Sequence, residues 1–219
     1  AAIYHHVDAY HLRNGARRWQ FPTDAQLHAS PALAEGLLVV ASDNGKVYGL
    51  EAMSGKKRWE FSCNAPVLAT PAIHQQRVFI GTARDSIFAI HLNHGTLLWK
   101  RYLGAKVMRS PAVHEGLVIF GSGDGTVRAF DVENGSPRWS FRAGSVIGTS
   151  PLLTDKLVFV GSLDHFLYAL DLRTGEELWK YQLDGRVRTN PILVGKYLVA
   201  ASEDRFVYVF GQPNSMPAN

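Results

Sequence analysis

Five aspartates recur near one position of a repeated segment, where their carboxylates could form a ring that binds a cation. They are Asp43, Asp85, Asp124, Asp164 and Asp204. An aspartate in a turn also accepts hydrogen bonds from its own backbone, which explains such a position without any ligand. We favour this turn role and keep the carboxylate ring as the alternative.

Nine histidines and a single cysteine are further candidates for metal binding or catalysis. His5 and His6 are adjacent, so in a strand they point to opposite faces and do not easily hold one ion. Cys63 alone excludes an intrachain disulfide and any multi-cysteine metal site. Catalytic triads are set by geometry rather than by order along the chain, and no such set is defined here. We therefore predict no metal site and no catalytic residue.

All of these residues lie within a repeat of 40 residues. A fixed period of this length indicates units that stack on one another, because one unit cannot bury its apolar face alone. Three residue types keep the period through five copies: Trp19, Trp59, Trp99, Trp139 and Trp179; Pro31, Pro71, Pro111, Pro151 and Pro191; and Gly15, Gly55, Gly95, Gly135 and Gly175.

The repeat at residues 146–182 shows the plan of one unit. Four short runs rich in β-branched and aromatic residues are separated by turns of two to five residues: Val146–Leu153, Leu157–Ser162, Phe166–Asp171 and Glu177–Gln182. Such a pattern predicts a four-stranded antiparallel meander. Repeated around an axis, the meander is a blade of an all-β propeller. Each tryptophan begins an outermost strand, and we expect its ring to pack between adjacent blades.

One glycine-rich segment, Gly121–Gly125, resembles a phosphate-binding loop in composition only. A dinucleotide loop is followed by a helix whose N-terminal amides meet the phosphates. Here the next residues form a predicted strand, so we interpret the segment as a hairpin turn.

Basic residues recur in the loops that the propeller would bring to one face. They are Arg84, Lys106, Arg109, Arg142, Arg186, Arg188 and Arg205, with His28 and His165 nearby. Seven cations on one rim exceed the net charge of +4. We expect this face to bind an anionic ligand or an acidic protein segment, and the alternative is a solvated rim. The small net charge does not favour nucleic acid.

The segment Ala169–Trp179 (ALDLRTGEELW) resembles the tryptophan-docking motif of pyrroloquinoline quinone (PQQ)-type propeller repeats. Ala129–Trp139 matches with one change, and Ser-Pro pairs such as Ser110-Pro111 are also typical. The earlier copies replace the motif's Asp by His11, Glu51 and His91. The resemblance covers residues 1–210, which we interpret as the propeller domain, and residues 211–219 are predicted to be a flexible tail.

This repeat occurs in quinoprotein dehydrogenases, in an outer-membrane β-barrel assembly lipoprotein and in receptor kinases, so the resemblance implies a fold more than a function. We predict a non-catalytic protein-binding or assembly scaffold that uses the basic face. The alternative is a ligand- or quinone-sensing domain attached to an enzyme or receptor kinase. A catalytic quinoprotein dehydrogenase ranks last, because one cysteine cannot form that family's adjacent-cysteine disulfide. We accordingly expect neither PQQ nor calcium, and the resemblance favours a periplasmic or other extracytoplasmic location. No apolar run is long enough for a transmembrane segment.

The number of blades is left open by the strand count, because the chain predicts 21 strands, one more than five blades require. We predict five blades, closed by pairing Arg17–Phe21 beside Phe206–Phe210. In that arrangement Tyr4–Tyr10 duplicates a place already taken by Phe206–Phe210, so we expect it to be displaced, frayed or paired with another molecule. The alternative is that the chain forms part of a seven- or eight-bladed ring.

Overall fold

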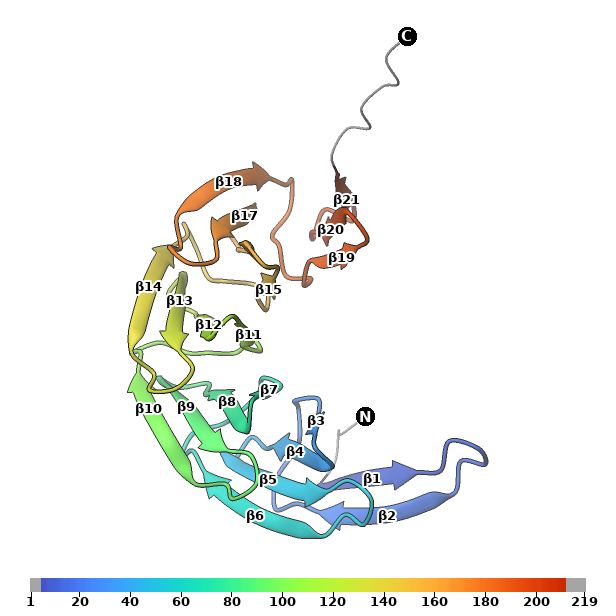
Figure 1. The fold of residues 1–219 in the computed structure, drawn as a ribbon. Helices are drawn as coiled ribbons and strands as arrows, with labels where there is room; N and C mark the ends of the chain where they lie inside the picture. Colours follow the sequence, from blue (N-terminus) through green and yellow to red (C-terminus); the bar gives the residue numbers. More distant parts are fainter. Residues whose placement is uncertain (1–4, 212–219) are drawn as a thin grey trace.

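A computed structural model describes residues 5–211 as 21 strands in six antiparallel sheets, with no helix in this range (Figure 1). We number the sheets as blades 1 to 6 in chain order. Of the predicted tail, only Gly211 falls within the described residues. The all-β propeller plan is confirmed.

Blades 2 to 5 each contain four strands, and the two end sheets contain fewer. Blade 1 consists of β1 (His6–Tyr10) and β2 (Arg17–Pro22), and blade 6 of β19 (Ile192–Val194), β20 (Tyr197–Ala201) and β21 (Val207–Phe210). The complete blades are β3 (Ala32–Ala34), β4 (Leu37–Ala41), β5 (Lys46–Glu51) and β6 (Lys57–Ser62); β7 (Ala72–His74), β8 (Arg77–Gly81), β9 (Ser86–His91) and β10 (Leu97–Tyr102); β11 (Ala112–His114), β12 (Leu117–Gly121), β13 (Thr126–Asp131) and β14 (Pro137–Arg142); and β15 (Leu152–Leu153), β16 (Leu157–Gly161), β17 (Phe166–Asp171) and β18 (Glu177–Gln182).

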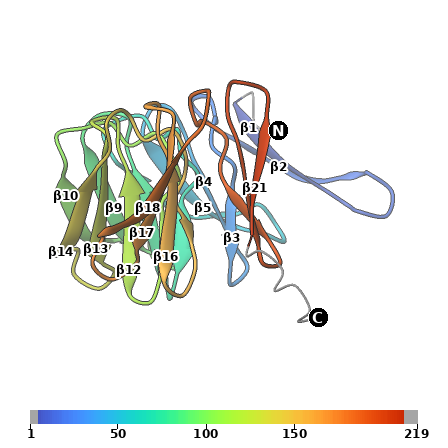
Figure 2. The same ribbon diagram turned by 90° about the horizontal axis from the view of Figure 1, so that it is seen from above.

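Within a complete blade, strands that follow one another in the chain are hydrogen-bonded neighbours. Gly121–Gly125 forms the turn between β12 and β13, so the hairpin interpretation is confirmed. The short strands β3, β7, β11 and β15 face the axis, while β6, β10, β14 and β18 lie on the outside (Figure 1). Seen along the other direction, the blades stand side by side with their loops at two opposite ends (Figure 2).

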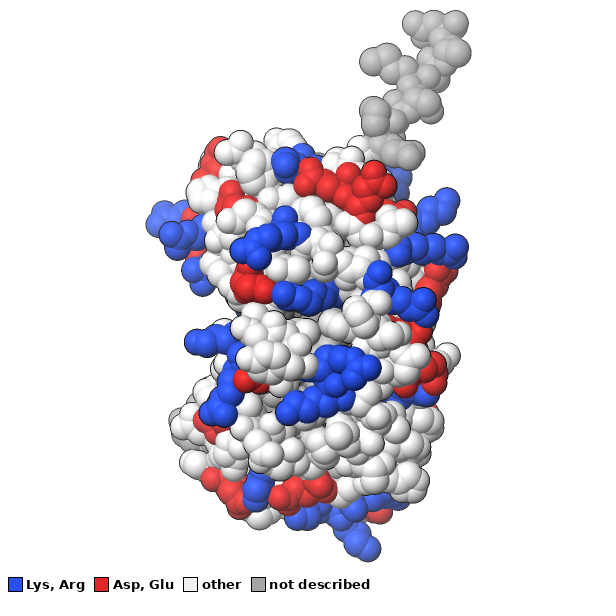
Figure 3. Space-filling model, turned by 90° about the vertical axis from the view of Figure 1, so that its left-hand side faces the viewer, with Lys and Arg blue, Asp and Glu red and all other residues white. Residues whose placement is uncertain are grey.

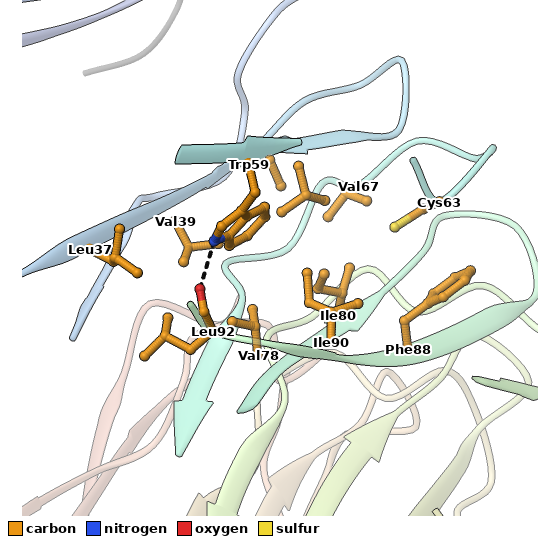
Figure 4. Packing of buried hydrophobic residues seen from close by; sticks show 12 residues of the cluster. Leu37, Val39, Trp59, Cys63, Val67, Val78, Ile80, Phe88, Ile90 and Leu92 are labelled. Carbon is orange, nitrogen blue, oxygen red and sulfur yellow. Dashed lines mark hydrogen bonds between the residues drawn. The ribbon is translucent and has the colours of Figure 1, made fainter. Parts of the chain in front are cut away.

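The joint between successive blades is made by the repeated tryptophan. Trp59 of blade 2 donates its indole N–H to the Leu92 carbonyl of blade 3 at 2.6 Å, within a core that includes Val39 and Ile90 (Figure 4). Its ring covers Gly95, where a Cβ atom would come within 2.6 Å of the indole. Gly95 also has a φ of +64°, so glycine is required here for two reasons.

Three other joints repeat this contact. The indole N–H groups donate to backbone carbonyls 33 residues further on: Trp19 to Ala52 at 3.0 Å, Trp99 to Val132 at 3.1 Å and Trp139 to Leu172 at 2.9 Å. Trp179 differs, because it is 36% exposed and packs against Phe159 and Phe210. The carbonyl 33 residues beyond Trp179 lies outside the described residues. The docking role is therefore confirmed for the first four tryptophans.

The predicted ring closure is wrong. Strand β2 pairs with β1, from His6↔Pro22 to Tyr10↔Arg17, and among the described residues β21 pairs only with β20. The blades instead form an arc whose two ends do not meet (Figure 1). The arrangement as part of a larger ring stays a prediction.

The strand predicted to be displaced is instead part of blade 1. Val7 of β1 is buried with Leu27 and Tyr48, and Phe21 of β2 packs against the same cluster. A hairpin closes over a short loop, so the local pairing of β1 with β2 costs far less loop entropy than pairing across the whole chain. The sequence prediction did not include this local pairing, because it assigned Arg17–Phe21 to the last blade in order to complete a ring of five blades.

Replacing Trp99 by Ala should lower the free energy of unfolding by about 3–5 kcal/mol, because a large aromatic is deleted from a packed interface. Trp99 is 6% exposed, so nearly all of its side chain contributes to the packing that the substitution removes. Chemical denaturation measures the effect, with Trp179→Ala as the matched control, for which we expect a smaller loss. Equal losses in the two variants would contradict the joint described above.

Replacing Val7 by Asn should lower the free energy of unfolding by at least about 1.5–3 kcal/mol, the value of burying one such side chain. Tyr10→Asn is the control, since Tyr10 lies on the same strand and is exposed. Thermal melts of both variants provide the measurement. If Val7→Asn melts like the unsubstituted protein, β1 is displaced after all.

Candidate functional site

The candidate site lies in the loops that lead from the outer strand of one blade to the inner strand of the next. The loop between β10 and β11 is held on both sides by backbone hydrogen bonds. Val107 N–H donates to the Thr82 carbonyl of blade 3 at 2.8 Å, and Gly123 N–H of blade 4 donates to the Lys106 carbonyl at 2.8 Å. Val107 itself is fully buried. These contacts fix the backbone that carries Lys106 and Arg109.

Two neighbouring hollows open beside this loop. The first, of about 240 Å³, spans blades 4 and 5 and is lined by the basic residues Lys106, Arg109 and Arg188 together with Met108, Val146, Ile147 and Leu163. The second, of about 330 Å³, is lined by Arg84, Lys106 and Asp124 among others. Four of the seven predicted basic residues are thus brought together.

The other three predicted basic residues line neither hollow. Arg142 is the last residue of the outer strand β14. Arg186 is exposed and accepts a backbone hydrogen bond from Glu203 N–H at 3.1 Å. Arg205 lies in the turn before β21 with a φ of 73°. Spacing along the sequence therefore does not identify which basic residues share a hollow.

The free charge of the site is smaller than the count of basic residues. The Arg188 Nε atom lies 2.7 Å from a carboxylate oxygen of Glu203, so this pair is neutral overall. Between residues 5 and 211, Arg84, Lys106 and Arg109 form no ion pair. Three cations therefore remain to attract an anionic group.

Apolar side chains beside these cations were not predicted from the sequence. Met108 is 51% exposed and Val146 is 38% exposed, and both line the first hollow. Met108 lies outside the runs that the sequence predicts as strands, whereas Val146 opens the predicted run Val146–Leu153, of which only Leu152–Leu153 forms a strand and Val146 lies in a loop. The hollow therefore combines an apolar surface with cationic edges.

The turn role of the recurring aspartates is confirmed for Asp124, Asp164 and Asp204. Their carboxylates accept the backbone N–H groups of Thr126, Phe166 and Phe206 at 2.8–3.0 Å, two residues further on. The repeat actually places Asn44 and Arg84 at this position, one residue from Asp43 and Asp85. Asn44 caps its turn in the same way, at 3.1 Å from Lys46 N–H. In the turn with Arg84, Thr82 Oγ1 accepts Ser86 N–H at 3.1 Å instead.

The Asp124 carboxylate is held in its charged form. Burial by itself would raise its pKa, but hydrogen bonds from Arg128, Ser122 and Thr126 N–H outweigh burial and hold the pKa well below its usual range. The negative charge of Asp124 is therefore largely compensated by Arg128 and by hydrogen bonds within blade 4.

Metal-binding and nucleophilic groups do not gather in the described part of the chain. No cluster of three or more His, Cys, Asp or Glu residues there has the arrangement of a metal site. His28 lies 3.7 Å from Asp43, and His114 lies 3.3 Å from Asp155. Cys63 is buried in a blade joint, and burial raises the pKa of its thiol to about 12. His165 lies in a turn with a φ of 76°.

The inner ends of the blades carry a further contact that the sequence did not reveal. Ser110 N–H donates to Ser150 Oγ at 3.1 Å, and Ser150 N–H donates to Asn190 Oδ1 at 2.8 Å. All three residues precede the repeated proline. The Ser150 and Asn190 side chains each accept a backbone N–H group from the preceding blade. These bonds link blades 4, 5 and 6 next to the candidate site.

The fold and the repeated joints define a propeller of the PQQ type. A family model described as outer membrane protein assembly factor BamB matches residues 5–140 and 123–213. The chain belongs to this family. No curated protein sequence matches the chain.

Three solved structures illustrate the fold. BamB from Moraxella catarrhalis is 22% identical with a TM-score of 0.69, over 97% of this chain and 78% of that protein. The computationally designed Ika8 protein is 20% identical with a TM-score of 0.85, over 96% of this chain and 66% of that one. The quinohemoprotein alcohol dehydrogenase ADHIIG from Pseudomonas putida HK5 is 20% identical with a TM-score of 0.74. That match covers 85% of this chain but 40% of the dehydrogenase.

Replacing Asp124 by Asn should flatten the acid branch of the stability curve. The folded-state pKa is lowered, so the stability from this group is fully present above the unfolded-state pKa of about 3.9 and is lost as the pH falls further. We expect the variant to melt at a lower temperature at neutral pH and to converge with the unsubstituted protein in acid. Thermal melts over a pH series test this, with Asp155→Asn as an exposed control. Parallel curves for Asp124→Asn would contradict it.

Proposed function

We propose that this chain is a non-catalytic scaffold that binds an acidic segment of a partner protein in the hollow between the β10–β11 loop and blade 5. The observation that carries the proposal is the combination of Lys106 and Arg109 with the exposed apolar side chains of Met108 and Val146. An acidic segment with one apolar side chain would match both features. Charge complementarity would set orientation and association rate, while the apolar contact would supply affinity.

The rigidity of the loops supports this proposal. The Lys106 carbonyl and the Val107 N–H are both engaged in hydrogen bonds to neighbouring turns. The loop after β14 is held in the same manner, because Leu163 N–H donates to the Val146 carbonyl at 2.9 Å. Binding to a surface that is already ordered loses less conformational entropy. The family description, an outer membrane protein assembly factor, is consistent with binding of proteins.

A competing function is sensing of a quinone or another small ligand, for which the similarity to the quinohemoprotein alcohol dehydrogenase is the supporting observation. A catalytic quinoprotein ranks below both. Our proposal includes neither PQQ nor calcium. Adding both and recording the absorption spectrum distinguishes these functions, since a bound quinone changes its spectrum and the scaffold proposal expects no change.

Replacing together by Ser the four basic residues that line the hollows, Arg84, Lys106, Arg109 and Arg188, should abolish binding of a labelled peptide in which Glu residues flank a single Leu. Fluorescence anisotropy measures the binding. Binding to the unsubstituted protein should weaken with salt, because the Debye length falls from about 10 Å at 0.1 M to about 3 Å at 1 M. Circular dichroism shows whether the variant keeps its fold.

The matched control carries Arg142→Ser and Arg205→Ser, two exposed basic residues that line neither hollow. It should bind the acidic peptide as the unsubstituted protein does. A peptide with Lys in place of Glu should not bind. Retained binding by the fourfold variant, or binding that does not respond to salt, would refute the proposal.

A further inference from the structure

Aromatic pairs close the outer part of four of the five blade joints. One ring comes from the outer strand of a blade and the other from the third strand of the next, 27 residues further along the chain. The pairs and the distances between their ring centroids are Phe21–Tyr48 at 5.4 Å, Phe61–Phe88 at 5.8 Å, Phe141–Tyr168 at 5.2 Å and Tyr181–Tyr208 at 6.1 Å.

The joint between blades 3 and 4 departs from this rule, because Arg101 and Arg128 occupy the two positions. Arg101 reaches across the joint and donates to the backbone carbonyls of Asn134 and Gly135, each at 2.8 Å. Arg128 turns to its own blade and donates to Asp124 at 2.6 Å. Two planar cations thus stand where every other joint has two aromatic rings in edge-to-face contact.

A groove of about 430 Å³ lies at this joint. Its apolar surface comes from Tyr102, Leu103, Phe130, Pro137 and Trp139, and its polar surface from Arg101, Arg128, Arg138 and Ser140. Tyr102 is 75% exposed. The groove is lined in part by residues of the outer strands β10 and β14. The outer side of the arc carries Lys, Arg, Asp and Glu side chains separated by uncharged surface (Figure 3).

The groove carries one net positive charge. Arg128 pairs with Asp124, and Arg138 pairs with Asp131, each at 2.6 Å. Arg101 donates only to backbone carbonyls, of Lys100, Asn134 and Gly135, and forms no ion pair within residues 5–211. These bonds use three of the five N–H groups of a guanidinium. Two N–H groups of Arg101 therefore remain for an anionic group.

We propose that this groove binds a small aromatic molecule that carries a carboxylate. Its ring would take the place of the aromatic pair that this joint lacks, against Tyr102, Phe130 and the guanidinium planes. Arg stacks on aromatic rings and also forms two parallel hydrogen bonds to a carboxylate, so both parts of such a ligand are recognised. The volume is within the range of about 300–1,000 Å³ that is usual for small-molecule sites. This site is separate from the basic face and does not depend on its function.

The test uses isophthalate, a benzene ring with two carboxylates, and measures binding by calorimetry. Acetate provides the charge without the ring, and benzyl alcohol provides the ring without the charge. We expect isophthalate to bind at least about tenfold more tightly than either, a difference of about 1.4 kcal/mol. Equal binding of acetate, or no binding of isophthalate at about 10 mM, would refute the proposal.

The decisive variant restores the rule of the other joints by replacing Arg101 and Arg128 with Phe. It should weaken isophthalate binding at least tenfold, since an aromatic pair would fill the groove. Arg101→Lys keeps the charge but loses the planar fork, and Tyr102→Ser removes the exposed ring; both should weaken binding without unfolding the protein. Arg58→Ser is the matched control, because Arg58 occupies in blade 2 the position of Arg138 in blade 4. Unchanged binding in the double variant, or equal loss in Arg58→Ser, would overturn the assignment.

Discussion

Contact between the tryptophan of one blade and the glycine turn of the next is the interaction on which the rest of this structure depends. A four-stranded sheet of this size buries neither face on its own, and an interior blade such as blade 3 is covered on one face by the blade before it and on the other by the blade after it. The indole does this in two ways, because its ring covers a glycine without a side chain and its N–H satisfies a backbone carbonyl in the same turn. The hydrogen bond sets the relative position of adjacent blades, so the same contact repeated four times produces a regular arc.

The basic face that we consider functional is a consequence of that regular arc. Because the joints are alike, the loops between blades fall at equal intervals, and each is held between the turns of two neighbours. A basic side chain in such a loop therefore has a fixed position relative to the equivalent side chain in the next loop. The groove at the joint of blades 3 and 4 arises in the opposite way, from a single departure from regularity at Arg101 and Arg128.

The last blade of the arc, which has no following blade within the described residues, shows how much burial a joint provides. On blade 6, the face turned away from blade 5 carries Ile192, Val194, Val207 and Val209, all exposed. In blades 2 to 5 the corresponding face is covered by the next sheet, so the counterparts of Val207 and Val209 are buried and those of Ile192 and Val194 are half-buried. Trp179, in the joint before blade 6, is correspondingly more exposed than Trp59 or Trp99. Burial at the joints thus comes from the following blade rather than from the properties of each sheet.

The sequence alone determined the blade architecture of this protein, because the residues that specify a blade are close together in the chain and recur with a fixed period. The 40-residue step of Trp, Pro and Gly, the short β-branched runs and the Asp-Gly turn at Asp124 specify blades, their strand order and the docking tryptophans. Strand pairing inside a blade joins near neighbours in the chain, which is why spacing predicts it. The turn role of Asp124 and Asp164 is equally local and was predicted for the same reason.

Only the tertiary structure decided whether the arc closes, which cations meet and where apolar side chains accompany them. Closure depends on the angle between blades summed over all joints, and a small change in that angle moves the two ends far apart. Lys106 and Arg188, 82 positions apart, line the same hollow because the packing of the blades brings their loops together, which residue spacing does not encode. The meaning of Arg101 and Arg128 likewise becomes visible only when four other joints show aromatic rings in contact at the same two positions.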